Sequence, residues 1–236
     1  MRRCSRRTAD RGGAGDGAAD AGPGERYRQG ERIRALLYQV EESPRGIVLK
    51  LSRSHPKFLA KLFETEAPEI ASGTVEIKAI AREAGSRSKV AVVSHDPHID
   101  PIGSMVGQRG VRVSTVTSEL GGEKIDIIEW SADPATFIED ALSPARVMNV
   151  SIIAEPNAET GDRGHAVVEV AGDQQSLAIG RGGQNVRLAA RLTGWKIDIK
   201  GTEAEVETTD EKLEGDDFVP LTALTSNQAI QNIFFS

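Results

Sequence analysis

The chain has 236 residues, of which 39% are hydrophobic and 27% are charged, and its formal net charge is −6. This length fits one or two domains, and the apolar fraction is sufficient for packed cores, which excludes a wholly disordered chain. No apolar run reaches the roughly 20 residues of a membrane span. A single cysteine, Cys4, excludes an internal disulfide framework and a cysteine-built zinc site. We therefore expect a cytoplasmic protein of a reducing compartment.

The two ends of the chain differ in composition from its middle. Residues 1–24 contain six glycines and five alanines without apolar periodicity, so we expect a disordered arm there. Residues 201–236 carry one lysine and eight acidic residues, and the tail 202–236 is also expected to be disordered. Because most of the negative charge lies in this tail, the net charge does not argue against a nucleic-acid partner.

The first regular structure expected along the chain is a β-hairpin. Alternating apolar residues occur in 31–40 and again in 45–53, and Ser43-Pro44-Arg45-Gly46 supplies the turn between them. An isolated hairpin is marginally stable in water, so this one must pack on another element. Residues 1–24 offer no further strand.

A repeated α/β unit follows the hairpin. The run Val106–Arg112 recurs as Ile179–Asn185, and Lys-Ile-Asp-Ile occurs at both 124–127 and 196–199. In each copy the spacing predicts helix, strand, strand, helix, glycine loop, helix and strand in that order. In the first copy we expect a helix with an apolar stripe at 58–63, strands at 75–79 and 89–94, and helices at 102–106 and 111–120. In the second we expect a helix starting at Asp133-Pro134, strands at 147–154 and 166–170, and helices at 174–179 and 184–193.

The two glycine loops are the strongest candidates for function. A GxxG turn between helices lets a nucleic-acid backbone approach closely, and the next helix begins with amides and a dipole that favour phosphate. The loops add Arg109 and Arg181, and Arg187 and Arg191 lie four residues apart on one helical face. A dinucleotide site is disfavoured, because that motif requires G-x-G-x-x-G directly after a strand.

These loops resemble those of KH domains, which bind about four nucleotides of single-stranded RNA. More narrowly, residues 53–56, 69–78, 82–89, 122–127, 141–145 and 176–180 resemble the NusA family of bacterial transcription termination/antitermination factors. The resemblance implies an α+β chain with two tandem prokaryotic-type (type II) KH domains at 54–131 and 132–201. A partial S1 (OB-type) domain at 25–53 would precede them. The family's polymerase-binding domain and most of S1 have no counterpart here, which favours a fragmentary or wrongly started reading frame.

Residue by residue, the resemblance implies RNA contacts in both loops and in the helices after them. The edge strands at 125–127 and 197–199 would lie along the bases. The expected RNA-binding residues are Gly107, Gln108, Arg109, Gly110, Arg112, Gly180, Arg181, Gly182, Gly183, Gln184, Asn185, Arg187 and Arg191.

The expected function is that of a non-catalytic RNA-binding elongation factor in pausing, termination and antitermination. Its expected partner is single-stranded nascent RNA, with RNA polymerase and other antitermination factors implied by the family. We expect a monomer without membrane contact or cofactor. We also expect no metal and no catalysis, since the four histidines form no catalytic triad or metal-ligand set. Two alternatives remain: the S1/KH region of a polynucleotide-phosphorylase-like RNA-processing system, and a KH-based protein-interaction module.

Overall fold

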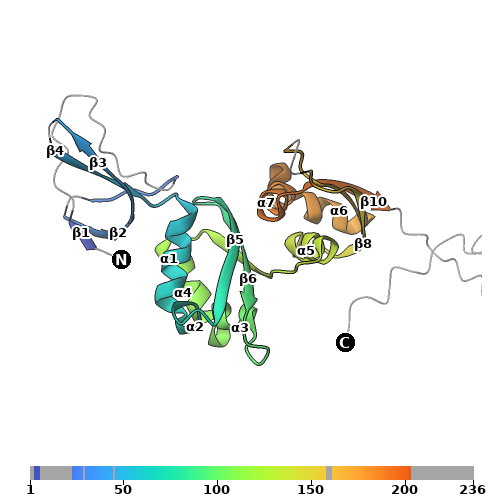
Figure 1. Cartoon of the computed structure of the whole chain (residues 1–236), viewed down its shortest axis with the longest axis horizontal. Helices are drawn as coiled ribbons and strands as arrows, with labels where there is room; N and C mark the ends of the chain where they lie inside the picture. The colour runs from blue at the N-terminus through green and yellow to red at the C-terminus, as the bar shows by residue number, and fades with distance from the viewer. Residues whose placement is uncertain (1–2, 6–22, 29, 45, 158–160, 203–236) are drawn as a thin grey trace, which may run out of the picture. The chain divides into compact units, whose positions relative to one another are not determined.

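The structure, a computed structural model, describes residues 3–5, 23–28, 30–44, 46–157 and 161–202 (Figure 1). The expectations of disorder at 6–22 and 203–236 fall outside these residues. All of the described residues belong to one compact unit of the chain. Among the described residues, no helix is long and apolar enough to cross a membrane.

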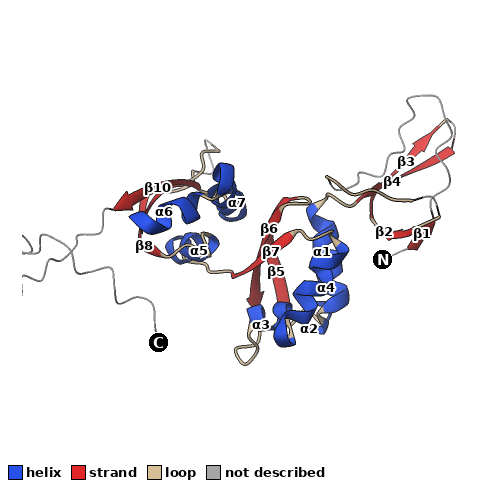
Figure 2. Ribbon diagram, turned by 180° about the vertical axis from the view of Figure 1, so that it is seen from behind, coloured by secondary structure: helices blue, strands red, loops and turns tan. Residues whose placement is uncertain are grey.

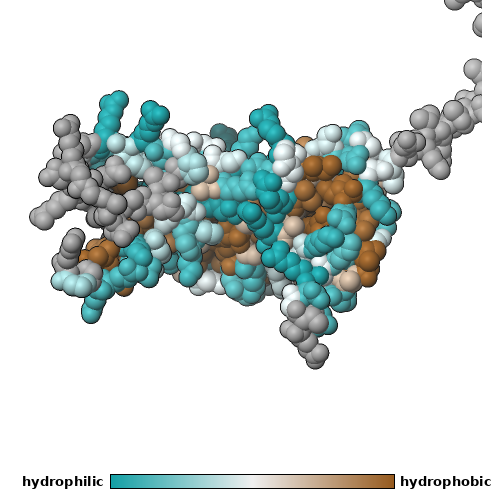
Figure 3. Space-filling view, turned by 90° about the horizontal axis from the view of Figure 1, so that it is seen from above, coloured by the Kyte–Doolittle hydropathy of each residue, from teal (hydrophilic) through white to brown (hydrophobic). Residues whose placement is uncertain are grey.

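The expected hairpin is present. Strands β3 (Leu36–Ser43) and β4 (Gly46–Ser52) pair antiparallel with Ser43 opposite Gly46, and Leu36 packs against the first core described below. Several of its apolar side chains remain exposed. Figure 3 shows hydrophobic residues at the surface of the molecule. Strand β2 (Arg32–Arg34) pairs with a further strand, β1 (Arg3–Ser5). These three residues of the expected arm are thus described as a strand, and disorder in the rest of the arm stays a prediction.

Both repeats fold as expected, in the same order of elements (Figure 2). The first unit consists of α1 (Pro56–Glu66), α2 (Pro68–Ala71), β5 (Val75–Glu83), β6 (Arg87–Ser94), α3 (Pro101–Val106), the 3₁₀ turn η1 (Gln108–Gly110), α4 (Val111–Glu119) and β7 (Lys124–Glu129). The second consists of α5 (Pro134–Ala141), β8 (Val147–Ala154), β9 (His165–Ala171), α6 (Gly172–Ile179), η2 (Arg181–Gly183), α7 (Gln184–Thr193) and β10 (Lys196–Thr202).

The two sheets share one topology. Their strand orders are β5-β6-β7 and β8-β9-β10, with the first pair antiparallel and the second pair parallel in each. A parallel pair requires a long crossover, and the helix–loop–helix segment that carries each glycine loop provides it. The fold therefore places each loop on the connection between the two parallel strands.

The first core lies between α1 and one face of its sheet. The apolar stripe of α1, which comprises Phe58, Leu59, Leu62 and Phe63, is at most 1% exposed. It packs in one cluster with Val90 and Val92 of β6. Helix α1 begins at Pro56, where the missing amide hydrogen of proline is harmless, and the His55 side chain accepts a hydrogen bond from the Lys57 amide.

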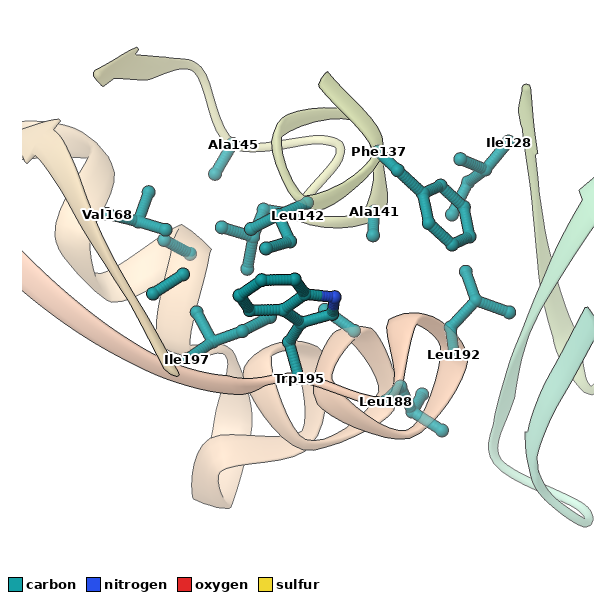
Figure 4. Close-up of a cluster of buried hydrophobic side chains, with 14 of the residues drawn as sticks. Ile128, Phe137, Ala141, Leu142, Ala145, Val168, Leu188, Leu192, Trp195 and Ile197 are labelled. Atoms are coloured by element: carbon teal, nitrogen blue, oxygen red, sulfur yellow. The ribbon is translucent and has the colours of Figure 1, made fainter. Parts of the chain in front are cut away.

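A second core joins the two units (Figure 4). Ala81, Ala91 and Ile128 of the first sheet pack with Phe137 and Leu188 of α5 and α7. Ala91 alternates with the two valines of the first core, so β6 is buried on both faces, as its continuous apolar run indicates.

One buried cation accompanies this joint core. Lys89 on β6 is fully buried, and its Nζ donates a hydrogen bond of 2.7 Å to the Ser143 carbonyl oxygen, which lies beyond α5. The same Nζ lies 3.2 Å from an oxygen of Asp126. Burial lowers the pKa of Lys89 from its usual value, while Asp126 opposes the shift. This contact adds a polar link between the two units.

Candidate nucleic-acid interface

The two glycine loops follow the same backbone path. Gly107 and Gly180 have φ/ψ of 73°/174° and 74°/171°, and Gly110 and Gly183 have 76°/14° and 72°/17°. The residue before the last glycine also has positive φ, 52° at Arg109 and 58° at Gly182. A left-handed arginine is unusual, so the first loop holds a conformation that most non-glycine residues avoid.

The first glycine of each loop is required by the protein's own packing. A Cβ at Gly107 would lie 2.6 Å from Cγ of Arg112, and one at Gly180 would lie 2.8 Å from the backbone nitrogen of Asn185. The last glycine of each loop faces open space: a Cβ at Gly110 would meet only Val113, at 4.0 Å, and one at Gly183 would meet nothing within 4 Å. Room for a ligand backbone therefore exists beside the last glycine and not beside the first.

Gly107→Ala is therefore expected to destabilise the chain more than Gly110→Ala. The first substitution adds a steric conflict in a backbone region that is almost exclusive to glycine, so a loss of about 2–3 kcal/mol in the free energy of unfolding is expected. The second adds only left-handed strain, about 1 kcal/mol. Urea unfolding of the two variants checks this order, and equal losses would contradict the assigned roles.

Arg112 and Asn185 occupy equivalent positions in the repeat, and both donate hydrogen bonds to the protein's own carbonyl oxygens. Arg112 Nη1 donates to the Ser104 carbonyl at 2.5 Å and to Glu69 Oε2 at 2.8 Å. Asn185 is fully buried, and its Nδ2 donates to the carbonyl oxygens of Leu142 at 2.9 Å and Ala178 at 3.1 Å. The expectation that the Asn185 amide reaches RNA is therefore wrong, since it satisfies backbone carbonyls inside the fold.

Side chains available to a ligand remain at the tip of each loop. Gln108, Arg109 and Arg181 are exposed, and neither arginine has a hydrogen bond or ion pair within the described part of the chain. The amides of Gly110 and Gly183 already donate within their own turns, to the carbonyls of Gly107 and Gly180 at 3.1 Å. Arginine side chains, rather than these amides, thus supply positive charge at the loop tips.

The helical face after the second loop is turned toward the first unit. One carboxylate, Glu83 at the end of β5, accepts hydrogen bonds from Gln184 at 2.8 Å and from Arg187 at 2.7 Å. Arg191 lies 3.7 Å from the same carboxylate. The hydrogen bonds from Arg187 are the main cause that holds the pKa of Glu83 below its usual value. The structure thus brings these three expected RNA-binding residues together, around an acid that the sequence did not single out.

The two edge strands lie where expected, but their isoleucines serve the cores. Ile125 and Ile127 of β7 pack against the first core, and Ile197 of β10 is 8% exposed in the joint core. Ile197 is therefore buried, and Ile125 and Ile127 are half-buried. Among the described residues, no group of three or more His, Cys, Asp or Glu could hold a metal ion.

The chain matches two domain families. Residues 53–130 match the NusA-like first KH domain, and residues 134–207 match the NusA-like second KH domain. Both matches contain the glycine loops and the helices after them.

Curated relatives extend this similarity across most of the chain. The "Transcription termination/antitermination protein NusA" of Thermus thermophilus is 53% identical over 191 residues, which cover 81% of this chain and 47% of that protein. The protein of the same name from Bacillus subtilis is 50% identical over 197 residues, 83% of this chain and 51% of its own length. The solved "Crystal structure of APE1850" matches 61% of this chain and 97% of its own, at 21% identity and a TM-score of 0.45.

The chain thus spans about half the length of the curated relatives that it matches. The shared half contains two units with one topology and two glycine loops with one backbone path. Through this tandem pair of KH domains, the chain belongs to the NusA-like proteins.

Proposed function

We propose that this chain binds single-stranded RNA through its two glycine loops, as a non-catalytic elongation factor in transcription pausing, termination and antitermination. The observation that carries the proposal is the pair of NusA-type KH loops, each with an open last glycine and an exposed arginine that has no partner among the described residues. The names of the curated relatives support the transcriptional role. They favour it over a polynucleotide-phosphorylase-like system and over a module that binds only proteins.

The mechanism that we propose is positional. The joint core packs α5 and α7 against the first sheet, so the two loops belong to one packed assembly. A strand held by one loop meets the other at a raised effective concentration, and its affinity can exceed that of either loop alone. A nascent transcript held in this way would have less freedom to form hairpins.

The proposed RNA contacts are a subset of the residues expected from the sequence. Gln108, Arg109, Gly110, Arg181, Gly182 and Gly183 would face RNA, whereas Arg112 and Asn185 support the loops from inside. We further propose that the protein is a cytoplasmic monomer without cofactor or metal. RNA polymerase and other antitermination factors would be partners of the longer protein to which the matched relatives correspond.

The salt dependence of RNA binding tests this assignment. Each lysine or arginine that neutralises a phosphate contributes about −0.7 to the slope of log affinity against log salt for a single strand. Arg109→Gln combined with Arg181→Gln is therefore expected to flatten the slope by about 1.4 and to weaken binding at low salt. Fluorescence anisotropy with a labelled single-stranded RNA of about 20 nucleotides measures both quantities.

The matched control is Lys57→Gln combined with Lys61→Gln, which removes the same charge from exposed positions on α1. This control should leave the slope unchanged. An equal loss of RNA affinity and salt dependence in both double variants would show a nonspecific charge effect and contradict the proposed loop contacts.

A further inference from the structure

Hydrogen bonds link Glu83 of the first unit, through Arg187, to the second glycine loop. Glu83 accepts hydrogen bonds from Arg187 Nε to Oε1 at 2.7 Å and from Nη2 to Oε2 at 3.2 Å. The remaining terminal nitrogen of Arg187, Nη1, donates to the Gly182 carbonyl oxygen at 3.1 Å. The carboxylate of one unit is thus connected through one guanidinium to the backbone of the other unit's loop.

A second contact anchors the other side of the loop's last glycine. Gln184, which directly follows Gly183, donates through Nε2 to Glu83 Oε2 and to Ser86 Oγ, both at 2.8 Å. The segment from Gly182 to Gln184 is therefore held at both ends by the turn that connects β5 and β6. Because a planar guanidinium presents its donors in a fixed fork, two bonds to one carboxylate fix its orientation.

In the described part of the chain, the first loop has no equivalent tether. The residue that corresponds to Arg187 in the first copy is Ser114, which is exposed and too short for such a contact. Arg109 in the first loop corresponds to Gly182 in the second, so the second loop has two adjacent glycines where the first has one. Glycine loses the most conformational freedom on ordering, and the second loop therefore gains more from an external support.

We propose that Glu83 is a positioning residue for RNA binding at the second loop: through Arg187 and Gln184 it holds that loop in its binding conformation. This inference rests on the proposed function and deepens it, because it makes the second KH loop depend on the first KH unit. Arg187 then acts chiefly as a support for the loop and not as a phosphate contact. Without this support, the loop would become ordered only when RNA binds, and the entropic cost of that ordering would weaken RNA affinity.

Glu83→Gln in the full chain tests the proposal, since glutamine keeps the shape and removes the charge. Without RNA, hydrogen exchange of the amides at 181–184 is expected to accelerate, while exchange at 108–111 in the first loop stays unchanged. With a labelled single-stranded RNA, the dissociation constant is expected to rise about three- to tenfold, a magnitude set by the ordering of a few residues. Arg187→Gln should accelerate exchange of the same amides. The double variant should add little further change, since both residues belong to the same series of hydrogen bonds.

Glu76→Gln is the matched control, because Glu76 lies on the same strand and pairs with Lys78 and His95, away from the second loop. It should change neither readout. Unchanged exchange at 181–184 in Glu83→Gln would overturn the proposal, and so would tighter RNA binding, which would make the carboxylate a competitor of phosphate. If the unaltered chain binds no RNA, the proposed function is wrong. The hydrogen exchange rates at 181–184 would still show whether Glu83 holds the second loop in place.

Discussion

Replacing Arg82 with methionine is expected to lower the free energy of unfolding by about 3–5 kcal/mol, because the substitution leaves a buried carboxylate without its counter-charge. The side chains of Arg82 and Glu123 are 2% and 1% exposed, and they are joined by hydrogen bonds from Nε and Nη2, both 2.9 Å. Arg82 Nη1 also donates to the carbonyls of Arg53 and His55. The pair therefore ties the start of the first unit to the turn before β7.

Urea unfolding of the variant measures this loss. Lys61→Met is the control, since Lys61 and Glu64 form an exposed ion pair and such pairs contribute less than about 1 kcal/mol. Adding Glu123→Leu to Arg82→Met removes the orphaned charge and should recover a substantial part of the stability. A loss below about 1 kcal/mol in the single variant would show that the remaining donors, the Gly85 amide and the Ser88 hydroxyl, suffice for Glu123.

Local signals in the sequence predict the elements of both units well. Asp133 is the N-cap of α5, and its side chain accepts a hydrogen bond from the Thr136 amide, as the Asp-Pro pair indicates. The glycine loops lie between helices, and the repeat predicts that both have one backbone path. These features depend on neighbours in the chain, which the sequence displays directly.

Features that depend on the packing of one unit against the other could not be predicted. The apolar run of β6 indicates burial on both faces, but not that Ala91 meets the second unit. In the sequence, Asn185 looks like an exposed amide beside a loop. Only the structure shows that its Nδ2 donates to the carbonyl oxygen of Ala178, near the end of the preceding helix. Glu83 ends a strand about a hundred residues before its partners, so no sequence spacing points to it.

Aspartate at both Gly110 and Gly183 is expected to weaken the binding of a single-stranded RNA that spans both loops by about a hundredfold. Both positions face open space, so the new side chains would occupy the room left for a ligand backbone. Two like charges 4 Å apart near a protein surface repel by about 4 kcal/mol before salt screening. Roughly a third of that value gives about tenfold per loop, and the losses multiply when one strand engages both loops.

Asparagine at the same two positions separates charge from shape. Asparagine and aspartate both tolerate the left-handed conformation, so each pair of substitutions should cost about 1–2 kcal/mol of stability and leave the fold intact. Circular dichroism and urea unfolding check this equality.

Anisotropy titrations should then show a much smaller loss of RNA affinity for the asparagine variant. Raising the salt concentration should reduce the difference in affinity between the two variants, because screening weakens the added repulsion. Equal losses for both variants would mean that the loops meet their ligand through shape and not through phosphate charge, and unchanged affinity in both would place the RNA elsewhere on the chain.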